Sequence, residues 1–109
     1  MSYPMDLDDH ATHIRALQIT AFGVDDGDRL VQTLVLCEEA GEVARVAAKE
    51  RQSIRPDTRG SWEHELGDVL LVALGLAALV GVNPDHALQA AKERLRKRGA
   101  KALAEVSRG

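Results

Sequence analysis

Five carboxylates at helical spacing are the residues of this sequence best suited to chemistry. Glu38, Glu39 and Glu42 are three and four residues apart, so a helix would place them on one side. Glu65 and Asp68, further along the chain, are again three residues apart. Oxygen ligands without a cysteine or an obvious histidine partner suit a hard cation such as Mg²⁺ or Mn²⁺. Such a cation keeps part of its water shell, binds substrate phosphates and activates water.

Each acidic pattern alone is weak support for a site, because EExxE and ExxD also occur on solvated helix faces. Their combination on successive helices is more telling, since Gly41 and Gly67 beside them would let the helix backbones approach closely. Carboxylates gathered between antiparallel helices would repel one another unless a cation neutralised them. His64, directly before Glu65, is either a neighbour of this site or a surface residue. The residues alone leave a metal site and a solvated acidic surface as alternatives.

Composition predicts that helices position these carboxylates. Hydrophobic residues make up 45% of the 109-residue chain and aromatic residues only 3%, so the apolar content is mostly Ala, Leu and Val. Ala and Leu favour helix, and we expect an all-α fold, a bundle of about four helices. One domain over 8–109 should follow a flexible N-terminus, residues 1–7. Apolar periodicity places the helices at about 8–22, 29–50, 62–80 and 84–104.

Turn and cap residues separate these predicted helices. A polar connector is expected over 51–60, and Gly81 before Asn83-Pro84 is typical of one helix ending and another beginning. Side chains that accept hydrogen bonds from a first helical turn are expected to cap the four helices; the candidates are Asp8 or Asp9, Asp28, Ser61 and Asn83.

The third predicted helix indicates self-association. Its run VLLVALGLAALV, residues 69–80, has no polar face, so this helix must be covered on every side. The other helices of so short a chain can hardly cover it. We therefore expect a homo-oligomer, a dimer or a tetramer, whose interface includes this helix.

Charge and cysteine content limit the partners and the location. The net charge of −3 provides no general attraction to nucleic acid or to anionic membranes, so neither is an expected partner. A single cysteine, Cys37, excludes an internal disulfide and fits a reducing compartment. The acidic N-terminus lacks the apolar core of a signal peptide, and the longest apolar run is too short to span a bilayer comfortably. We expect a cytoplasmic protein.

Two stretches of the sequence, LCEEAGEV and HELGDVLLVALGLAALVGVNPDHALQAAKERLRKR, resemble the MazG-like all-α nucleoside triphosphate pyrophosphohydrolases. The resemblance extends over about residues 30–98. The signature of that family is ExxE, a spacer of variable length, then ExxD. In this chain it is matched by Glu39-x-x-Glu42 and Glu65-x-x-Asp68, and the G-V-N-P turn and the basic tail add to the resemblance.

The resemblance implies cleavage of a nucleoside triphosphate to the nucleoside monophosphate and pyrophosphate. It also implies that the four signature carboxylates hold Mg²⁺, which Mn²⁺ can replace because both ions prefer oxygen ligands. Glu38 would be the catalytic residue, orienting or deprotonating the attacking water.

Further residues are implied for the phosphates and the base. The last helix of the family presents Asn-x-Lys-x-x-x-Arg near the phosphates, and the corresponding residues here are Lys92, Arg94 and Arg98, with Lys92 in place of the amide. Solvation of a basic helix end is the alternative explanation for this cluster. Base recognition in the family involves the first helix and neighbouring subunits, which makes Gln18 and Phe22 the candidates here.

Two other functions fit parts of the pattern. Phosphoribosyl-ATP pyrophosphohydrolase, of the same superfamily, has a second helix that EEAGEV followed by AAK resembles. Its usual E-x-x-D-L-x-Y-H stretch reads ELGDVLLV here, which argues against that activity. A helical interaction module that kept the fold and lost turnover is the alternative of a different class, and the five intact carboxylates argue against it.

Overall fold

The fold was analysed in a computed structural model that describes residues 5–22, 29–52 and 59–108. Within these ranges the chain forms helices and no strand, which confirms the predicted all-α fold. The helices are α1 (Leu7–Phe22), α2 (Arg29–Gln52), α3 (Arg59–Val80) and α4 (Pro84–Arg108). Because α3 begins at Arg59, the prediction that Ser61 caps this helix was wrong. Asp28, the predicted cap of α2, lies outside the described residues.

The first turn of α1 is capped by Asp6, not by the predicted Asp8 or Asp9. The Asp9 N–H donates to Oδ1 of Asp6 at 2.8 Å, and the Asp6 N–H donates to Oδ2 of Asp9 at 3.4 Å. This reciprocal pair satisfies backbone donors that a helix start leaves free. Of the predicted flexible segment 1–7, residues 1–4 lie outside the described part, and Leu7 already belongs to the helix.

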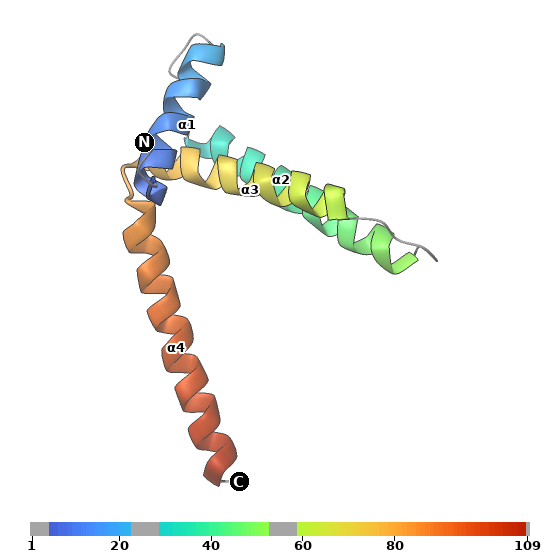
Figure 1. Cartoon of the computed structure of the whole chain (residues 1–109), viewed down its shortest axis with the longest axis vertical. Helices are drawn as coiled ribbons and strands as arrows, with labels where there is room; N and C mark the ends of the chain where they lie inside the picture. Colours follow the sequence, from blue (N-terminus) through green and yellow to red (C-terminus); the bar gives the residue numbers. More distant parts are fainter. Residues whose placement is uncertain (1–4, 23–28, 53–58, 109) are drawn as a thin grey trace.

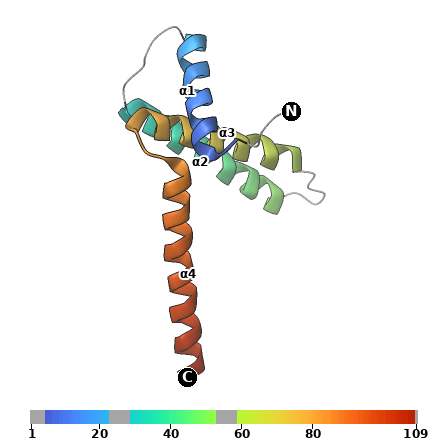
Figure 2. The same cartoon turned by 60° about the vertical axis from the view of Figure 1, so that its left-hand side comes forward.

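The frame of the molecule is the antiparallel pair α2 and α3, which lie side by side in both views (Figures 1 and 2). α1 packs across α3, and α1 and α4 extend in opposite directions from the hairpin. Among the described residues of α1, α2 and α3, the buried apolar side chains are Ala11, Val46 and Val72. Each of these three helices therefore contributes one small side chain to a very small core.

The turn between α3 and α4 follows the predicted Gly-Val-Asn-Pro chemistry. Gly81 has a φ of 75°, which favours glycine because it has no Cβ. The Val82 N–H donates to the Ala77 carbonyl at 2.9 Å and the Gly81 N–H to the Ala78 carbonyl at 3.3 Å, the pattern of a Schellman helix end. Across this break the helix direction changes by 111°.

Asn83 caps α4 as predicted, and Asp85 joins α4 to α1. Oδ1 of Asn83 accepts hydrogen bonds from the N–H groups of Asp85 (2.9 Å) and His86 (3.2 Å). The Asp85 carboxylate in turn accepts from the N–H groups of Leu7 and Asp8, both at 3.0 Å. The first turns of α1 and α4 are thus linked by one carboxylate that completes the cap of α1.

Beyond this link, α4 projects away from the other helices (Figure 1). The radius of gyration is 17.9 Å, compared with about 13 Å for a compact domain of this length. Large apolar side chains remain exposed on α2, α3 and α4, among them Leu30 (65%), Leu70 (62%) and Leu95 (68%). One copy of the chain therefore leaves much of its apolar surface uncovered.

No single helix in the described ranges is long and apolar enough to cross a membrane; α3 and α4 meet that criterion only when the bent pair is counted together.

Replacement of Asp85 should destabilise the chain through the start of α1. We expect Asp85→Ala to lower the free energy of unfolding by about 1–2 kcal/mol, because two N–H groups of α1 lose their acceptor. Asp85→Asn, which keeps one oxygen acceptor, should lose less. Gln89→Ala, an exposed change one turn further along α4, is the control. Urea unfolding at one fixed protein concentration measures the difference, and equal stability of Asp85→Ala and Gln89→Ala would contradict the prediction.

Candidate functional site

The α2–α3 hairpin brings the five predicted carboxylates into one electrostatic environment. Partial burial raises the pKa of Glu39 above its ordinary value of 4.5, and the negative charges of Asp68, Glu65, Glu38 and Glu42 raise it further. Neighbouring carboxylates act in this direction because they disfavour a further negative charge. Two of the four neighbours belong to α3 and two to α2, so both helices contribute charge around Glu39.

Exposure separates the residues of this carboxylate site. Glu39 and Glu42 on α2 and Glu65 and Asp68 on α3 are half-buried, whereas Glu38 is exposed. Glu42 also lies 3.3 Å from a guanidinium nitrogen of Arg45, an ion pair between partly exposed side chains. The four signature carboxylates are therefore partly shielded from solvent, and Glu38 is the most open of the five.

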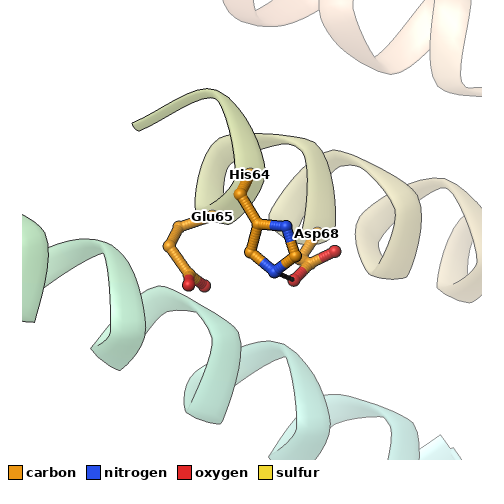
Figure 3. A group of neighbouring side chains, drawn as sticks. All are labelled: His64, Glu65 and Asp68. Atoms are coloured by element: carbon orange, nitrogen blue, oxygen red, sulfur yellow. Dashed lines mark ion pairs between the residues drawn. The ribbon is translucent and has the colours of Figure 1, made fainter. Parts of the chain in front are cut away.

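On α3 a histidine belongs to the same cluster. One ligand atom from each of His64, Glu65 and Asp68 lies within 4.8 Å of the other two, and Figure 3 shows these side chains on the side of α3 that faces α2. His64 Nε2 is 3.3 Å from Oδ2 of Asp68. Of the two alternatives for His64, the structure has it as a neighbour of the carboxylates, although its side chain is 71% exposed. The spacing of four residues between His64 and Asp68 was the signal that predicts this contact.

The donors present fit a divalent cation. Opposite ligands of Mg²⁺ are about 4.2 Å apart, since each lies at 2.0–2.1 Å from the ion. Adjacent ligands of an octahedral ion are about 3 Å apart, so the ligand atoms of His64, Glu65 and Asp68, which lie within 4.8 Å of one another, would have to move closer together to share one ion. A cation would also relieve the repulsion that raises the pKa of Glu39. Carboxylate oxygens are the ligands that Mg²⁺ and Mn²⁺ prefer.

An open pocket of about 390 Å³ adjoins the carboxylates, where the second half of α2 faces the first turns of α3. Two of its lining residues, Glu42 and Glu65, also belong to the carboxylate site. The Trp62 Nε1–H donates to Oε2 of Glu50 at 2.6 Å and ties α2 to α3 in the same part of the hairpin. The pocket is lined by Glu42, Arg45, Val46, Ala48, Lys49, Gln52, Ser61 and Glu65.

A family model for the MazG nucleotide pyrophosphohydrolase domain matches residues 28–102. The chain belongs to the MazG family. The matched range contains α2, α3 and most of α4, and therefore all five carboxylates. No curated protein is similar enough to the chain to be matched with it. MazG membership supports a function of the nucleotide pyrophosphohydrolase type, in a family that is generally metal-dependent.

The residues predicted for phosphate binding lie elsewhere in this MazG chain. Lys92, Arg94 and Arg98 are exposed on α4, which runs away from the hairpin in both views (Figures 1 and 2). The 111° change of direction after Val80 and the link through Asp85 set this course. Within one chain, the structure does not bring these basic residues to the carboxylate site.

The two candidates for base recognition are on α1, which crosses α3. The carboxamide of Gln18 lies against Gly75 of α3, where a Cβ would be only 2.8 Å from Nε2 of Gln18. Glycine at this position therefore leaves the space that the amide occupies. Phe22 is the last residue of α1, and its side chain lies outside the described part of the structure.

The raised pKa of Glu39 predicts how stability depends on pH when divalent ions are removed. A carboxyl whose pKa is raised in the folded state binds its proton more tightly there than in the unfolded chain. The resulting destabilisation should be fully present above the folded pKa and lost as the pH falls through it toward 4.5. We expect Glu39→Gln to remove this dependence, to raise the melting temperature at neutral pH in chelator, and to reduce the stabilisation by Mg²⁺.

Glu63→Gln, an exposed carboxylate on α3 outside the cluster, is the matched control and should behave as wild type in both respects. Melting curves between pH 4 and 8, with chelator or with Mg²⁺, provide the measurement. A lower melting temperature of Glu39→Gln in chelator, or full stabilisation of this variant by Mg²⁺, would show that Glu39 does not experience the repulsion described.

Proposed function

We propose that this MazG chain is a metal-dependent nucleotide pyrophosphohydrolase, which cleaves an NTP or dNTP to the nucleoside monophosphate and pyrophosphate. The observation that supports the proposal most directly is the gathering of carboxylates from α2 and α3 around Glu39, whose pKa is raised by partial burial and further by their charges. A surface acidic patch would spread such charges apart, whereas a site for divalent cations and phosphates requires them together.

In this proposal Glu39, Glu42, Glu65 and Asp68 hold Mg²⁺, or Mn²⁺ in its place. The bound ion supplies charge neutralisation for the phosphates and a more acidic water. Glu38, exposed beside Glu39, orients the attacking water and accepts its proton. The water oxygen bonds to one of the two phosphorus atoms that flank the α–β bridging oxygen, and the bond from that phosphorus to the bridging oxygen breaks. Attack at the α-phosphorus expels pyrophosphate and attack at the β-phosphorus expels the nucleoside monophosphate, so both routes give the same two products.

The position of Gln18 supports a place for the base along the same hairpin. Gly75, against which Gln18 packs, follows Asp68 by seven residues on α3. Seven residues are two helical turns, so Gly75 lies about 10 Å from Asp68 along the axis and on nearly the same face. A nucleotide with its phosphates at Asp68 then extends its base toward α1, where Gln18 and the neighbouring Phe22 are the proposed contacts.

We further propose that the chain acts as a homo-oligomer, a dimer or a tetramer. The exposed apolar side chains of α2, α3 and α4, together with the extended shape of one copy, support an assembly that covers them. Between residues 92 and 101, α4 has six basic side chains and one acidic one. A helix of this charge from a second copy complements the carboxylate site and would bring Lys92, Arg94 and Arg98 to the phosphates.

Activity is tested by pyrophosphate release from a panel of ribo- and deoxynucleoside triphosphates. We expect turnover that stops with chelator and returns with Mg²⁺ or Mn²⁺. Glu42→Gln and Asp68→Asn should abolish turnover and weaken metal binding, which calorimetry measures. Glu38→Gln should slow turnover by about 10²–10⁴-fold, the usual contribution of a general base, and retain more of the metal affinity. No pyrophosphate from any nucleotide, with melting curves indifferent to Mg²⁺, would refute the proposed function.

Assembly is tested on Leu70, an exposed apolar residue of α3. Burial of one leucine contributes on the order of 2 kcal/mol, so Leu70→Asp at an interface should dissociate or unfold the protein. Leu70→Met, which keeps the surface apolar, should preserve the assembly. Light scattering on wild type and both variants at micromolar concentration gives the mass of each. A wild-type monomer that is stable and active under these conditions would contradict the proposal.

A further inference from the structure

The charge of the side chains that line the pocket beside the carboxylate site changes along the hairpin. From Glu42 on α2 the lining continues through Arg45 and Lys49 to Gln52, at intervals of three and four residues that keep one helical face. From Glu65 on α3 the lining continues back to Ser61. Acidic groups therefore line the end nearer the carboxylate site, and basic and neutral polar groups line the end that points away from it.

The far end of the pocket offers donors suited to an anion with several oxygens. Arg45 has a planar set of N–H donors, and Lys49 adds an ammonium group one turn later. The Ser61 hydroxyl and the Gln52 carboxamide can also donate. The ion pair of Arg45 with Glu42 joins side chains that are 79% and 43% exposed, so Arg45 can turn from this weak pair to a more highly charged ligand.

The distances suit a ligand that also occupies the carboxylate site. Ser61 precedes Glu65 by one turn, about 6 Å along the axis of α3. The hydrogen bond between Trp62 and Glu50 joins α2 and α3 at this level of the hairpin. A volume of about 390 Å³ leaves room for two phosphoryl groups with their water.

We propose that this pocket binds the pyrophosphate end of the substrate, with Lys49 and Arg45 holding the two phosphoryl groups that leave. The inference rests on the proposed function and gives the nucleotide one orientation on the hairpin. Its base lies toward Gln18 and Gly75, its reacting phosphate lies at the carboxylates, and its terminal phosphates lie between Arg45 and Ser61. These cations belong to the same chain as the carboxylates, in contrast to the proposed contribution of α4 from a second copy.

The test compares Lys49→Gln with Arg51→Gln. Both positions are exposed basic residues near the end of α2, and Arg51 does not line the pocket, so each variant loses one positive charge from the same helix. Calorimetry on the full chain with Mg²⁺ measures the affinity for inorganic pyrophosphate and, separately, for nucleoside monophosphates. Melting curves of both variants should match that of wild type, because neither side chain is part of the core.

We expect Lys49→Gln to weaken pyrophosphate binding by about tenfold or more, the usual effect of losing one charge-assisted contact. Binding of nucleoside monophosphate should stay unchanged, as should both affinities in Arg51→Gln. Arg45→Gln should resemble Lys49→Gln. Equal losses of pyrophosphate affinity in Lys49→Gln and Arg51→Gln would show that only the general positive charge of α2 matters, and would overturn the inference. Equal losses of affinity for pyrophosphate and for nucleoside monophosphate in Lys49→Gln would overturn it as well.

The outcome is separable from the proposed function. If wild type releases pyrophosphate from nucleotides while Lys49→Gln keeps full pyrophosphate affinity, the function stands and the pocket assignment is wrong. If wild type turns over no nucleotide but binds pyrophosphate through Lys49, the pocket assignment stands and the reaction is wrong.

Discussion

Several carboxylates placed between two packed helices repel one another, and the arrangement of this chain depends on how that repulsion is balanced. The pKa of Glu39 is raised by partial burial and, in addition, by the negative charges of carboxylates on both α2 and α3. The helices are nevertheless held together by apolar packing at Val46 and Val72 and by the bond between Trp62 and Glu50. In the proposed function a divalent cation would convert the same charges from a destabilising group into ligands, which would couple metal binding to the stability of the hairpin.

The sequence predicts the features that depend on local rules. Ala- and Leu-rich composition and apolar periodicity predicted the helices, and the Gly81 to Pro84 stretch predicted the turn and the Asn83 cap. The ExxE and ExxD spacings also predicted that carboxylates from two helices would converge, because a short connector between helices leaves few other arrangements.

Features that depend on contacts between distant residues were not predicted. Asp6, Asp8 and Asp9 are equivalent cap candidates by sequence, and the choice of Asp6 is consistent with Asp85, across the chain, accepting from the N–H groups of Leu7 and Asp8. The course of α4 likewise follows from the bend after Val80, which residue patterns within α4 do not encode. The pocket beyond Glu42 combines side chains of two helices, so it exists only once their register is known.

The bend at Gly81 makes the position of the far end of α4 sensitive to small changes in the backbone. The helix has 25 residues, which makes it about 37 Å long, and only its first turns are fastened to α1. A change of about 10° in the angle of this bend would move the C-terminal end of α4 by about 6 Å, since the displacement grows with distance from the pivot. Any side chain added at Gly81, where φ is 75°, would strain that pivot. A small change in the backbone angles at this one glycine would thus displace all the basic residues between 92 and 101 by several times as much.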